Sequence, residues 1–340
     1  MSRIAIIGAG AWGTALSIIL GRKESHEIQL WAHEKEVCES ISRQRVNELF
    51  LPGQRIPGCV RACDDLEEAI DGAAIVVSVM PSQHCRQLFE RMRPHLSGNT
   101  IIVSATKGLE EKSLLRMTEV ITQVVKDHGI PAPRIGALSG PSFALEAARG
   151  DPTAVAIASQ DKELARFVQH EFSHASFRLY TNDDPVGVEL GGALKNTVAI
   201  AAGVCAGLGL GHNSVAALIT RGLAEMTRLV AACGGKAETM AGLAGLGDLV
   251  LTCTGGLSRN RSVGVELGRG RKLPEILAGM HGMVAEGIFT TTAAVGLARA
   301  RGVEMPITEQ MHAILHEGKA PREAIHDLMT RSRKSEALEA

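Results

Sequence analysis

One lysine stands alone in a long stretch without other charges. Lys195 carries the only formal charge between Leu190 and Thr220, among Ala, Gly, Val, Leu, Ile and small polar residues. Burial lowers the pKa of a lysine ammonium group, so a desolvated lysine can donate and accept protons near neutral pH. A lysine at a helix end can instead extend its ammonium group into water, and composition alone favours that interpretation. The other polar motifs of the chain shift the balance toward a catalytic role.

A glycine motif lies at the N-terminus. Gly8, Gly10 and Gly13 have the G-x-G-x-x-G spacing, between the β-branched run Ile4–Ile7 and the helix-forming run Ala11–Leu20. In a strand–turn–helix context such glycines let backbone N–H groups approach a pyrophosphate at the positive end of the helix. The motif therefore predicts a dinucleotide-binding site.

The position that selects the cofactor ribose holds a histidine. About 20 residues beyond the last glycine, an NAD-selective fold presents Asp or Glu to the ribose 2′-hydroxyl. This chain has His33 there, followed by Glu34. A protonated His33 could accept the extra phosphate of NADPH, Glu34 suits NADH, and a solvated loop histidine is a third interpretation. Both NADPH and NADH stay open as cofactors.

Two further motifs follow predicted strands. Lys107 comes shortly after Thr100–Val103, at the carboxyl edge where open α/β sheets bind ligands. Gly140 and Ser142 follow Ile135–Leu138 and could offer N–H groups and a hydroxyl to an anion. Each motif also has a purely structural interpretation, as a surface lysine or a capped turn.

Two more motifs lie in the C-terminal half. Asp248 is predicted in a loop, where it could orient the ammonium group of Lys195 or simply cap the next helix. Ser258, Arg259 and Asn260 follow two glycines at a predicted helix start, where a guanidinium group suits a phosphate, unless they form an exposed basic turn. Together the motifs predict hydride transfer to a small phosphorylated ketone.

The elements that must position these residues change character near Asn182. Before it, predicted strands alternate with helical segments, which is typical of a doubly wound parallel sheet. After it, Ala-, Leu- and Gly-rich helices dominate. We therefore expect an α/β protein with a Rossmann-type dinucleotide-binding domain at residues 1–182 and an all-helical substrate and catalytic domain at residues 183–340. The predicted strands are Ile4–Ile7, Ile28–Trp31, Ile75–Val79, Thr100–Val103, Ile135–Leu138 and Thr153–Ala158. The predicted helices include Glu34–Arg45, Ser82–Arg91, Lys112–Asp127, Gly187–Cys205, Asn213–Cys233, Ser258–Gly268, Leu273–Ala278, Thr290–Ala300, Thr308–His316 and Pro321–Arg331.

Composition limits the partners. The 340 residues exceed one ordinary core, and a net charge of −1 gives no general attraction to nucleic acid or to an anionic membrane. One Tyr, two Trp and seven Phe provide no obvious platform for stacking bases. Seven cysteines without zinc spacing predict free thiols in a reducing compartment and no metal site.

Two apolar segments could be mistaken for targeting or membrane segments. Arg3 followed by Ile4–Leu20 resembles a signal peptide, but the glycine motif interrupts it and no cleavage pattern follows. The run Thr197–Leu210 is expected to be too short and too rich in glycine to span a bilayer. We expect a cytoplasmic protein.

The motifs together resemble one family over nearly the whole chain, the bacterial NAD(P)-dependent glycerol-3-phosphate dehydrogenases. The matching segments are GAGAWGTAL, SATKGLE, GPSFALE, GGALKN, AALITRGLAEM, GLAGLGDLVLTCT, LSRNR and VAEG. The resemblance implies reversible reduction of dihydroxyacetone phosphate to sn-glycerol 3-phosphate, which feeds phospholipid synthesis. Three departures stand out: Ala206 and His212 replace common acidic residues, and His33 replaces a frequent Arg.

The resemblance also implies roles for individual residues. The catalytic residues would be Lys195 as general acid/base, Asp248 and Lys107. The substrate would contact Lys107, Gly140, Ser142, Lys195, Asn196, Asp248, Thr252, Ser258, Arg259 and Asn260. The cofactor would contact Gly8, Gly10, Ala11, Trp12, Gly13, His33, Lys107, Ala144, Arg259, Val284 and Glu286.

Two other functions are compatible with the residues. A related β-hydroxyacid dehydrogenase would use Arg259 to bind a carboxylate. A redox sensor would bind the dinucleotide without turning it over, which leaves Lys195 and Asp248 without a role. The oligomeric state stays open, with a homodimer as one alternative.

Overall fold

The computed structural model describes residues 2–23, 25–127, 133–280, 284–333 and 335–336. The chain divides into two compact units. Unit 1 comprises Met1–Lys107 and Leu115–Val188, and unit 2 comprises Gly108–Leu114 and Glu189–Ala340. The main boundary in sequence therefore lies at Val188, a few residues after the expected boundary at Asn182, and the segment Gly108–Leu114 is assigned to unit 2 although it lies within the first predicted domain.

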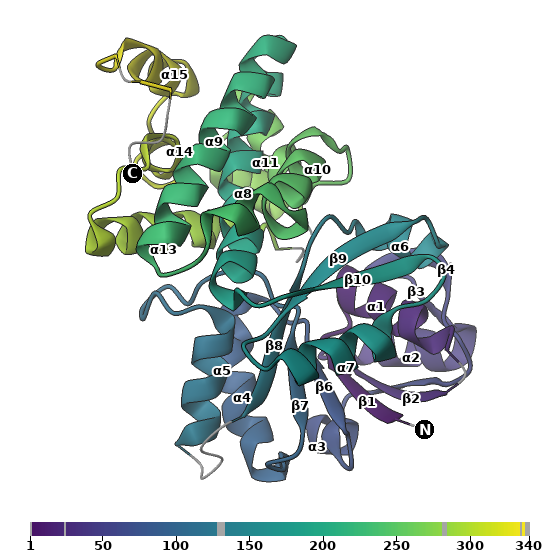
Figure 1. Cartoon of the computed structure of the whole chain (residues 1–340). Helices are drawn as coiled ribbons and strands as arrows, with labels where there is room; N and C mark the ends of the chain where they lie inside the picture. The colour runs from purple at the N-terminus through teal and green to yellow at the C-terminus, as the bar shows by residue number, and fades with distance from the viewer. Residues whose placement is uncertain (1, 24, 128–132, 281–283, 334, 337–340) are drawn as a thin grey trace. The chain divides into compact units, whose positions relative to one another are not determined.

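Unit 1 is built on an eight-stranded sheet with the strand order β10-β9-β8-β7-β6-β1-β2-β5 (Figure 1). Its strands are β1 (Ser2–Ile7), β2 (His26–Trp31), β5 (Val60–Cys63), β6 (Ile75–Ser78), β7 (Ile101–Ser104), β8 (Arg134–Ser139), β9 (Thr153–Ala158) and β10 (Phe177–Asn182). A small hairpin of β3 (Val46–Asn47) and β4 (Leu51–Arg55) forms a separate sheet. All six predicted strands are present, and the expected Rossmann-type fold is confirmed.

Hydrophobic side chains alternate between the two faces of the sheet along its buried strands. On β1, Ile4 and Ile6 belong to one hydrophobic cluster, whereas Ala5 and Ile7 belong to another. Successive side chains of a strand point to opposite faces, so these two clusters are the two cores of a doubly wound sheet. The first cluster includes residues of α1 (Ala11–Gly21), α2 (Lys35–Gln44), α6 (Ala144–Arg149) and α7 (Lys162–Phe172). The second includes residues of α3 (Leu66–Ile70), α4 (Cys85–Met92) and α5 (Met117–Lys126).

Two predictions for unit 1 are wrong. The sheet is not wholly parallel, because β8 and β9 pair antiparallel. The short helix α6 between them packs against α1 and does not carry a full crossover back to the sheet. In addition, α5 begins at Met117 and not at Lys112, because Leu114 has a left-handed φ of 62° that a helix cannot contain.

Helices dominate the described residues of unit 2 after Val188, whereas its segment Gly108–Leu114 is not helical. Its helices are α8 (Pro185–Gly207, beginning in unit 1), α9 (His212–Ala232), α10 (Asp248–Thr254), α11 (Arg259–Gly268), α12 (Leu273–Ala278), α13 (Glu286–Arg301), α14 (Pro306–His316) and α15 (Pro321–Thr330). All the helices predicted after Asn182 are present, and of the α-helices described in this unit, α10 was not predicted. Of the residues that depart from the family pattern, Ala206 lies within α8, and His212 begins α9 and is exposed.

The apolar run around Thr197 belongs to a longer helix than expected. α8 has 23 residues and is long and apolar enough to cross a membrane by length and composition, so the expectation that the run is too short is wrong. However, 89% of its most apolar 18-residue window is buried within the protein. Burial among the other helices therefore accounts for its composition, as in the core helix of a globular protein.

Glycines let α8 and α11 approach at backbone distance. A Cβ atom added to Gly264 on α11 would lie 1.9 Å from the carbonyl oxygen of Ile200 on α8. One added to Gly207 on α8 would lie 2.2 Å from the carbonyl oxygen of Val265. No side chain can occupy such a space, so these glycines set the distance between the two helices.

We expect Gly264→Ala to destabilise the protein by about 2 kcal/mol or more, because the added methyl group must separate α8 from α11. The free energy of unfolding in denaturant measures this effect. Gly256→Ala is the control, since nothing lies within 4 Å of a Cβ atom at that position. Equal stability of the two variants would contradict the close packing.

A buried carboxylate holds the start of α14. Glu225 on α9 accepts hydrogen bonds from the backbone N–H groups of Ile307 (2.7 Å) and Thr308 (3.3 Å). Burial raises the pKa of Glu225 from 4.5 to about 7, and these hydrogen bonds only partly oppose the increase. The folded protein therefore retains a proton on Glu225 over a pH range in which the unfolded chain has lost it.

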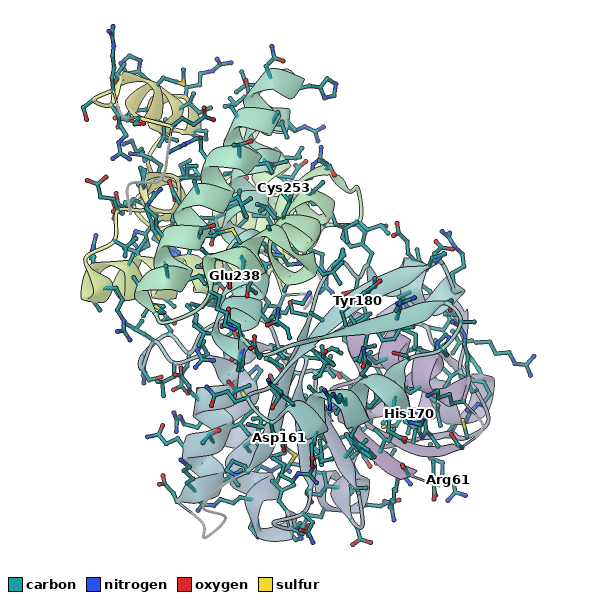
Figure 2. The ribbon with its side chains drawn as sticks, in the orientation of Figure 1. Arg61, Asp161, His170, Tyr180, Glu238 and Cys253 are labelled. Atoms are coloured by element: carbon teal, nitrogen blue, oxygen red, sulfur yellow. The ribbon has the colours of Figure 1, made fainter. Side chains whose placement is uncertain are left out.

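This raised pKa predicts a pH dependence of stability. The folded state is most stable below pH 4.5, where Glu225 is protonated in both the folded and the unfolded chain. As the pH rises from 4.5 to about 7, the free energy of unfolding falls by about 3 kcal/mol, because ionisation is easier in the unfolded chain. Glu225→Gln should remove that part of the pH dependence, measured as the free energy of unfolding between pH 5 and pH 8. The exposed Glu238 (Figure 2) provides the control variant Glu238→Gln. An unchanged pH profile in Glu225→Gln would refute the assignment.

Candidate active site

The isolated lysine is buried and paired. Lys195 on α8 is 6% exposed, and its Nζ donates hydrogen bonds to Oδ1 of Asp248 and to Oγ1 of Thr252 (2.9 Å). Asp248 and Thr252 lie four residues apart on α10, so both side chains face the same side of the helix. We call Lys195, Asp248 and Thr252 the lysine cluster.

The position of Asp248 differs from the prediction. Asp248 does not lie in a loop: it is the first residue of α10, directly after a π-helical turn at Leu243–Gly247. Its side chain bonds Lys195 and does not serve as a simple cap. The local sequence signal for this helix is weak, because α10 has only seven residues and follows a glycine-rich segment.

Glycines also allow the close contact between α8 and the turn that precedes α10. A Cβ atom added to Gly191, one helical turn before Lys195 on α8, would lie 2.5 Å from the carbonyl oxygen of Ala244. One added to Gly245 would lie 2.2 Å from the carbonyl oxygen of Met240. The turn before α10 therefore lies directly on α8, which brings Asp248 within reach of the lysine.

The hydrogen bonds of the cluster fix the direction of the ammonium group. The hydroxyl of Thr252 donates to the backbone carbonyl of Asp248 (2.6 Å), so its oxygen is oriented to accept from Lys195. A buried ammonium group needs such partners, because an unpaired charge in the interior is strongly unfavourable. A lysine held in this way can transfer a proton to a substrate oxygen.

The neighbouring thiol does not compete for this chemistry. Cys253 lies next to Thr252 on α10 (Figure 2), and burial raises its pKa to about 12. Lys195 and Arg261 oppose this increase, whereas Asp248 adds to it. The thiol therefore stays protonated, and the cluster supports proton transfer better than nucleophilic sulfur chemistry.

Asn260 connects three helices beside the cluster. Its Nδ2 donates to Oδ1 of Asn196 on α8 (3.0 Å), and its Oδ1 accepts from the backbone N–H of Gly287 on α13 (2.9 Å). Both asparagine side chains are buried. The sequence suggested Asn260 as a phosphate contact, and the structure adds a positioning role for it that no local pattern revealed.

Arg259 lies at the start of α11, as predicted. Ser258 caps this helix by accepting a hydrogen bond from the N–H of Arg261 (3.2 Å). Arg259 is exposed, and its Nη1 donates to the carbonyl oxygen of Val284 (3.2 Å). Although the residue as a whole is exposed, partial desolvation of its guanidinium group lowers the pKa of Arg259, and the carboxylate of Glu286 opposes this shift. Three predicted cofactor residues, Arg259, Val284 and Glu286, therefore lie together in unit 2.

In unit 1 the three glycines of the N-terminal motif have different functions. Gly8 has a φ of 119°, and a Cβ atom there would lie 2.9 Å from the carbonyl oxygen of Val79. A Cβ atom on Gly13 would lie 1.8 Å from the carbonyl oxygen of Gly8. Gly10, at the N-cap of α1, has nothing within 4 Å, and no side chain caps the helix. Gly8 and Gly13 are therefore required for packing, whereas Gly10 keeps open the space in front of α1 that a pyrophosphate would occupy.

A second polar group lies at the carboxyl ends of β7 and β8. Lys107 Nζ and Ser142 Oγ both donate to the carbonyl oxygen of Gly140, at 3.4 and 2.9 Å. Gly140 has a φ of 146°, and a Cβ atom there would lie 2.9 Å from the Cα of Val155. Ala144 begins α6 just beyond this turn. The structure thus brings together Lys107, Gly140 and Ser142, which the sequence predicted as separate motifs.

Of the three remaining cofactor candidates, Ala11 is the first residue of α1, and Trp12 and His33 contact aromatic rings. Trp12, in the first turn of α1, packs against Phe177 with ring centroids 6.4 Å apart. His33 follows β2, is exposed, and lies 6.1 Å from the ring of Trp31.

Comparisons with known proteins agree along the whole chain. The sequence model of the family NAD-dependent glycerol-3-phosphate dehydrogenase, N-terminus, matches residues 3–165. The corresponding family model for the C-terminus matches residues 184–326. A glycerol-3-phosphate dehydrogenase of Koribacter versatilis, named for NAD(P)+, is 66% identical over 99% of each chain. The chain belongs to the NAD-dependent glycerol-3-phosphate dehydrogenase family. The resemblance suggested by the sequence motifs is confirmed.

Other members of the glycerol-3-phosphate dehydrogenase family agree in sequence and fold. The enzyme of Acidobacterium capsulatum is 56% identical and covers 99% of this chain and all of its own length. The crystal structure of the Coxiella burnetii enzyme superposes with a TM-score of 0.91 at 41% identity, covering 97% of this chain and 99% of its own. The fold class predicted from the sequence is that of the family.

Proposed function

We propose that this protein catalyses the reversible reduction of dihydroxyacetone phosphate to sn-glycerol 3-phosphate, with NADH or NADPH as cofactor. The observation that carries the proposal is the lysine cluster, a buried ammonium group oriented by Asp248 and Thr252. The names of the full-length relatives support the same reaction.

The residues of unit 1 fit a dinucleotide cofactor. Its pyrophosphate would lie over Gly8–Gly13, where Gly10 leaves room at the uncapped N-terminus of α1. When bound, the nicotinamide supplies the hydride for the ketone carbon. Ala11, Trp12, His33 and Ala144 are the proposed further contacts in unit 1.

Lys195 performs the proton transfer in this proposal. In the reductive direction its ammonium group donates a proton to the oxygen of the developing alkoxide, and in the oxidative direction the amine takes the proton back. Asp248 and Thr252 each accept a hydrogen bond from Nζ of Lys195, and these two bonds align the ammonium group. Asn196, held by Asn260, is the proposed neighbouring substrate contact.

The phosphate of the substrate provides the binding energy for orientation. Arg259 can make two parallel hydrogen bonds to it, and Ser258 and Asn260 lie in the same helix start. Lys107, with Gly140 and Ser142, adds a second cationic position. Binding energy from a group that does not react can then align the carbonyl carbon for the reaction.

We further propose a cytoplasmic location, a homodimeric assembly and a role in phospholipid precursor supply. All seven cysteines are free thiols, which suits a reducing compartment.

Removing the lysine should abolish most of the chemistry. We expect Lys195→Ala to lower kcat for dihydroxyacetone phosphate by at least ~10²-fold, because it removes the general acid. Cofactor binding, followed by fluorescence, should stay close to that of the wild type. Lys319→Ala is the matched control, since Lys319 also pairs with an aspartate, Asp327. Near-normal turnover in Lys195→Ala would contradict the assigned role.

Removing the arginine should weaken phosphate binding. We expect Arg259→Ala to raise KM for dihydroxyacetone phosphate by at least ~10-fold, because the substitution removes a charge-assisted hydrogen bond to the phosphate. The effect should shrink for dihydroxyacetone, which lacks the phosphate. Arg269→Ala, which alters an exposed arginine directly after the same helix, is the control. Equal losses with both substrates would show that Arg259 does not bind the phosphate. A carboxylate-specific relative would instead turn over short hydroxy acids better than the phosphorylated ketone.

A further inference from the structure

A side chain from outside the glycine motif holds one carbonyl oxygen within it. Nδ2 of Asn47, in the hairpin of β3 and β4, donates hydrogen bonds to the carbonyl oxygen of Ala9 and to Oγ1 of Thr14, both at 2.8 Å. The hydroxyl of Thr14 also donates to the carbonyl oxygen of Ala9 (3.1 Å). All three residues are buried. We call Ala9, Thr14 and Asn47 the asparagine bridge.

Both ends of the Asn47 amide have a partner. Its Oδ1 accepts a hydrogen bond from the backbone N–H of Phe50 (3.1 Å), across the loop of its own hairpin. Since the amide oxygen faces this N–H donor, the NH₂ group is the end that faces the glycine motif. A carboxylate of the same shape could accept from Phe50 but has no hydrogen to donate to Ala9. The bridge therefore requires an amide at this position.

The hairpin that carries the asparagine is anchored to its surroundings in unit 1. Arg45, at the C-terminal end of α2, has a left-handed φ of 59°, and its guanidinium group donates to the carbonyl oxygens of Pro57 and Val60. Ser40 on α2 donates from its hydroxyl to the carbonyl oxygen of Val46 (2.7 Å), one residue before the asparagine. The hairpin also contacts α1 and α6 (Figure 1). Its position beside α1 is therefore fixed at several points.

The asparagine bridge fixes the peptide unit that leads into α1. A peptide unit is planar and trans, so the N–H of Gly10 points away from the carbonyl oxygen of Ala9, and holding one holds the other. The preceding carbonyl oxygen, that of Gly8, lies so close to Gly13 that it cannot turn freely either. Two successive peptide units are thus held, one by a close approach within the motif and the other by Asn47. The backbone at the uncapped start of α1 is therefore oriented before a ligand binds.

We propose that Asn47 is a positioning residue for the cofactor: it orients the peptide unit between Ala9 and Gly10 so that the start of α1 is ready to bind the pyrophosphate. The proposal rests on the dinucleotide site of the proposed function. Without the amide, the hydroxyl of Thr14 is the remaining described donor to the buried carbonyl oxygen of Ala9. The peptide unit could then rotate, and the free energy of ordering it would oppose binding. Since proton transfer depends on Lys195 in unit 2, the loss should fall on cofactor binding and not on the chemical step.

Equilibrium binding to the full-length protein, without substrate, tests this role. Kd for NADH comes from the fluorescence of the reduced nicotinamide, and Kd for ADP-ribose, which has the pyrophosphate but no nicotinamide, comes from competition with NADH. We expect Asn47→Asp to raise both Kd values by at least ~10-fold, because a buried acceptor loses its donor. At saturating NADH, kcat for dihydroxyacetone phosphate should stay within ~3-fold of the wild type. A merely structural role would instead lower kcat through loss of folded protein and leave Kd unchanged.

A second pair of variants tests the bridge without adding a charge. Thr14→Val removes the hydroxyl that connects Asn47 and Ala9, and we expect it to raise both Kd values by at least ~3-fold. Thr14→Ser retains the hydroxyl and should restore binding close to that of the wild type. If Asn47→Asp does not fold, as judged by circular dichroism, the difference between Thr14→Val and Thr14→Ser decides the question.

Ser40→Ala is the matched control for the hairpin. It removes the hydrogen bond to the carbonyl oxygen of Val46 and leaves the asparagine bridge in place, so both Kd values should stay within ~2-fold of the wild type. Wild-type Kd values in folded Asn47→Asp, equal Kd values in Thr14→Val and Thr14→Ser, or an equal increase in Ser40→Ala would overturn the positioning role. Failure of the wild type to bind NADH and ADP-ribose would instead reject the dinucleotide site and the proposed function.

Discussion

The structure of unit 2 depends on how it stabilises the buried ammonium group of Lys195. A charged lysine in the interior is tolerated only beside an oppositely charged partner that is itself well fixed. Asp248 can be that partner because the turn before α10 lies on the backbone of α8 at Gly191. The contact of α8 with the turn before α10 places Asp248 where it both stabilises the buried charge of Lys195 and orients the ammonium group. Stability and proton transfer therefore depend on the same helix contact.

Backbone-to-backbone contacts recur wherever the protein needs a polar group in a defined place. Gly203 and Gly264 bring α8 against α11, and a Cβ atom on Gly287 of α13 would lie 2.8 Å from the carbonyl oxygen of Asn196. These close approaches bring Asn196 and Asn260 within hydrogen-bond distance. In the glycine motif of unit 1, by contrast, the middle glycine faces open space and leaves room for a ligand.

The sequence predicted features whose signals are local. The glycine motif, the buried strands and the helix start at Ser258 each depend on neighbouring residues, and the isolation of Lys195 is visible within thirty residues of sequence. Features that depend on strand order or helix packing could not be predicted in this way. The antiparallel pair of β8 and β9, joined through the short helix α6 that packs on α1, is such a feature. The sequence left open whether Asp248 orients Lys195 or caps a helix, because the packing at Gly191 that brings it to Lys195 is not local.

The anchoring of α14 by Glu225 has a consequence for the C-terminal part of the chain. The carboxylate receives its N–H donors from residues 307 and 308, more than eighty positions further along. A chain shortened before Pro306 would leave that carboxylate in an apolar environment without donors. The start of α14 must therefore be synthesised before the buried carboxyl group of α9 can acquire its hydrogen-bond donors.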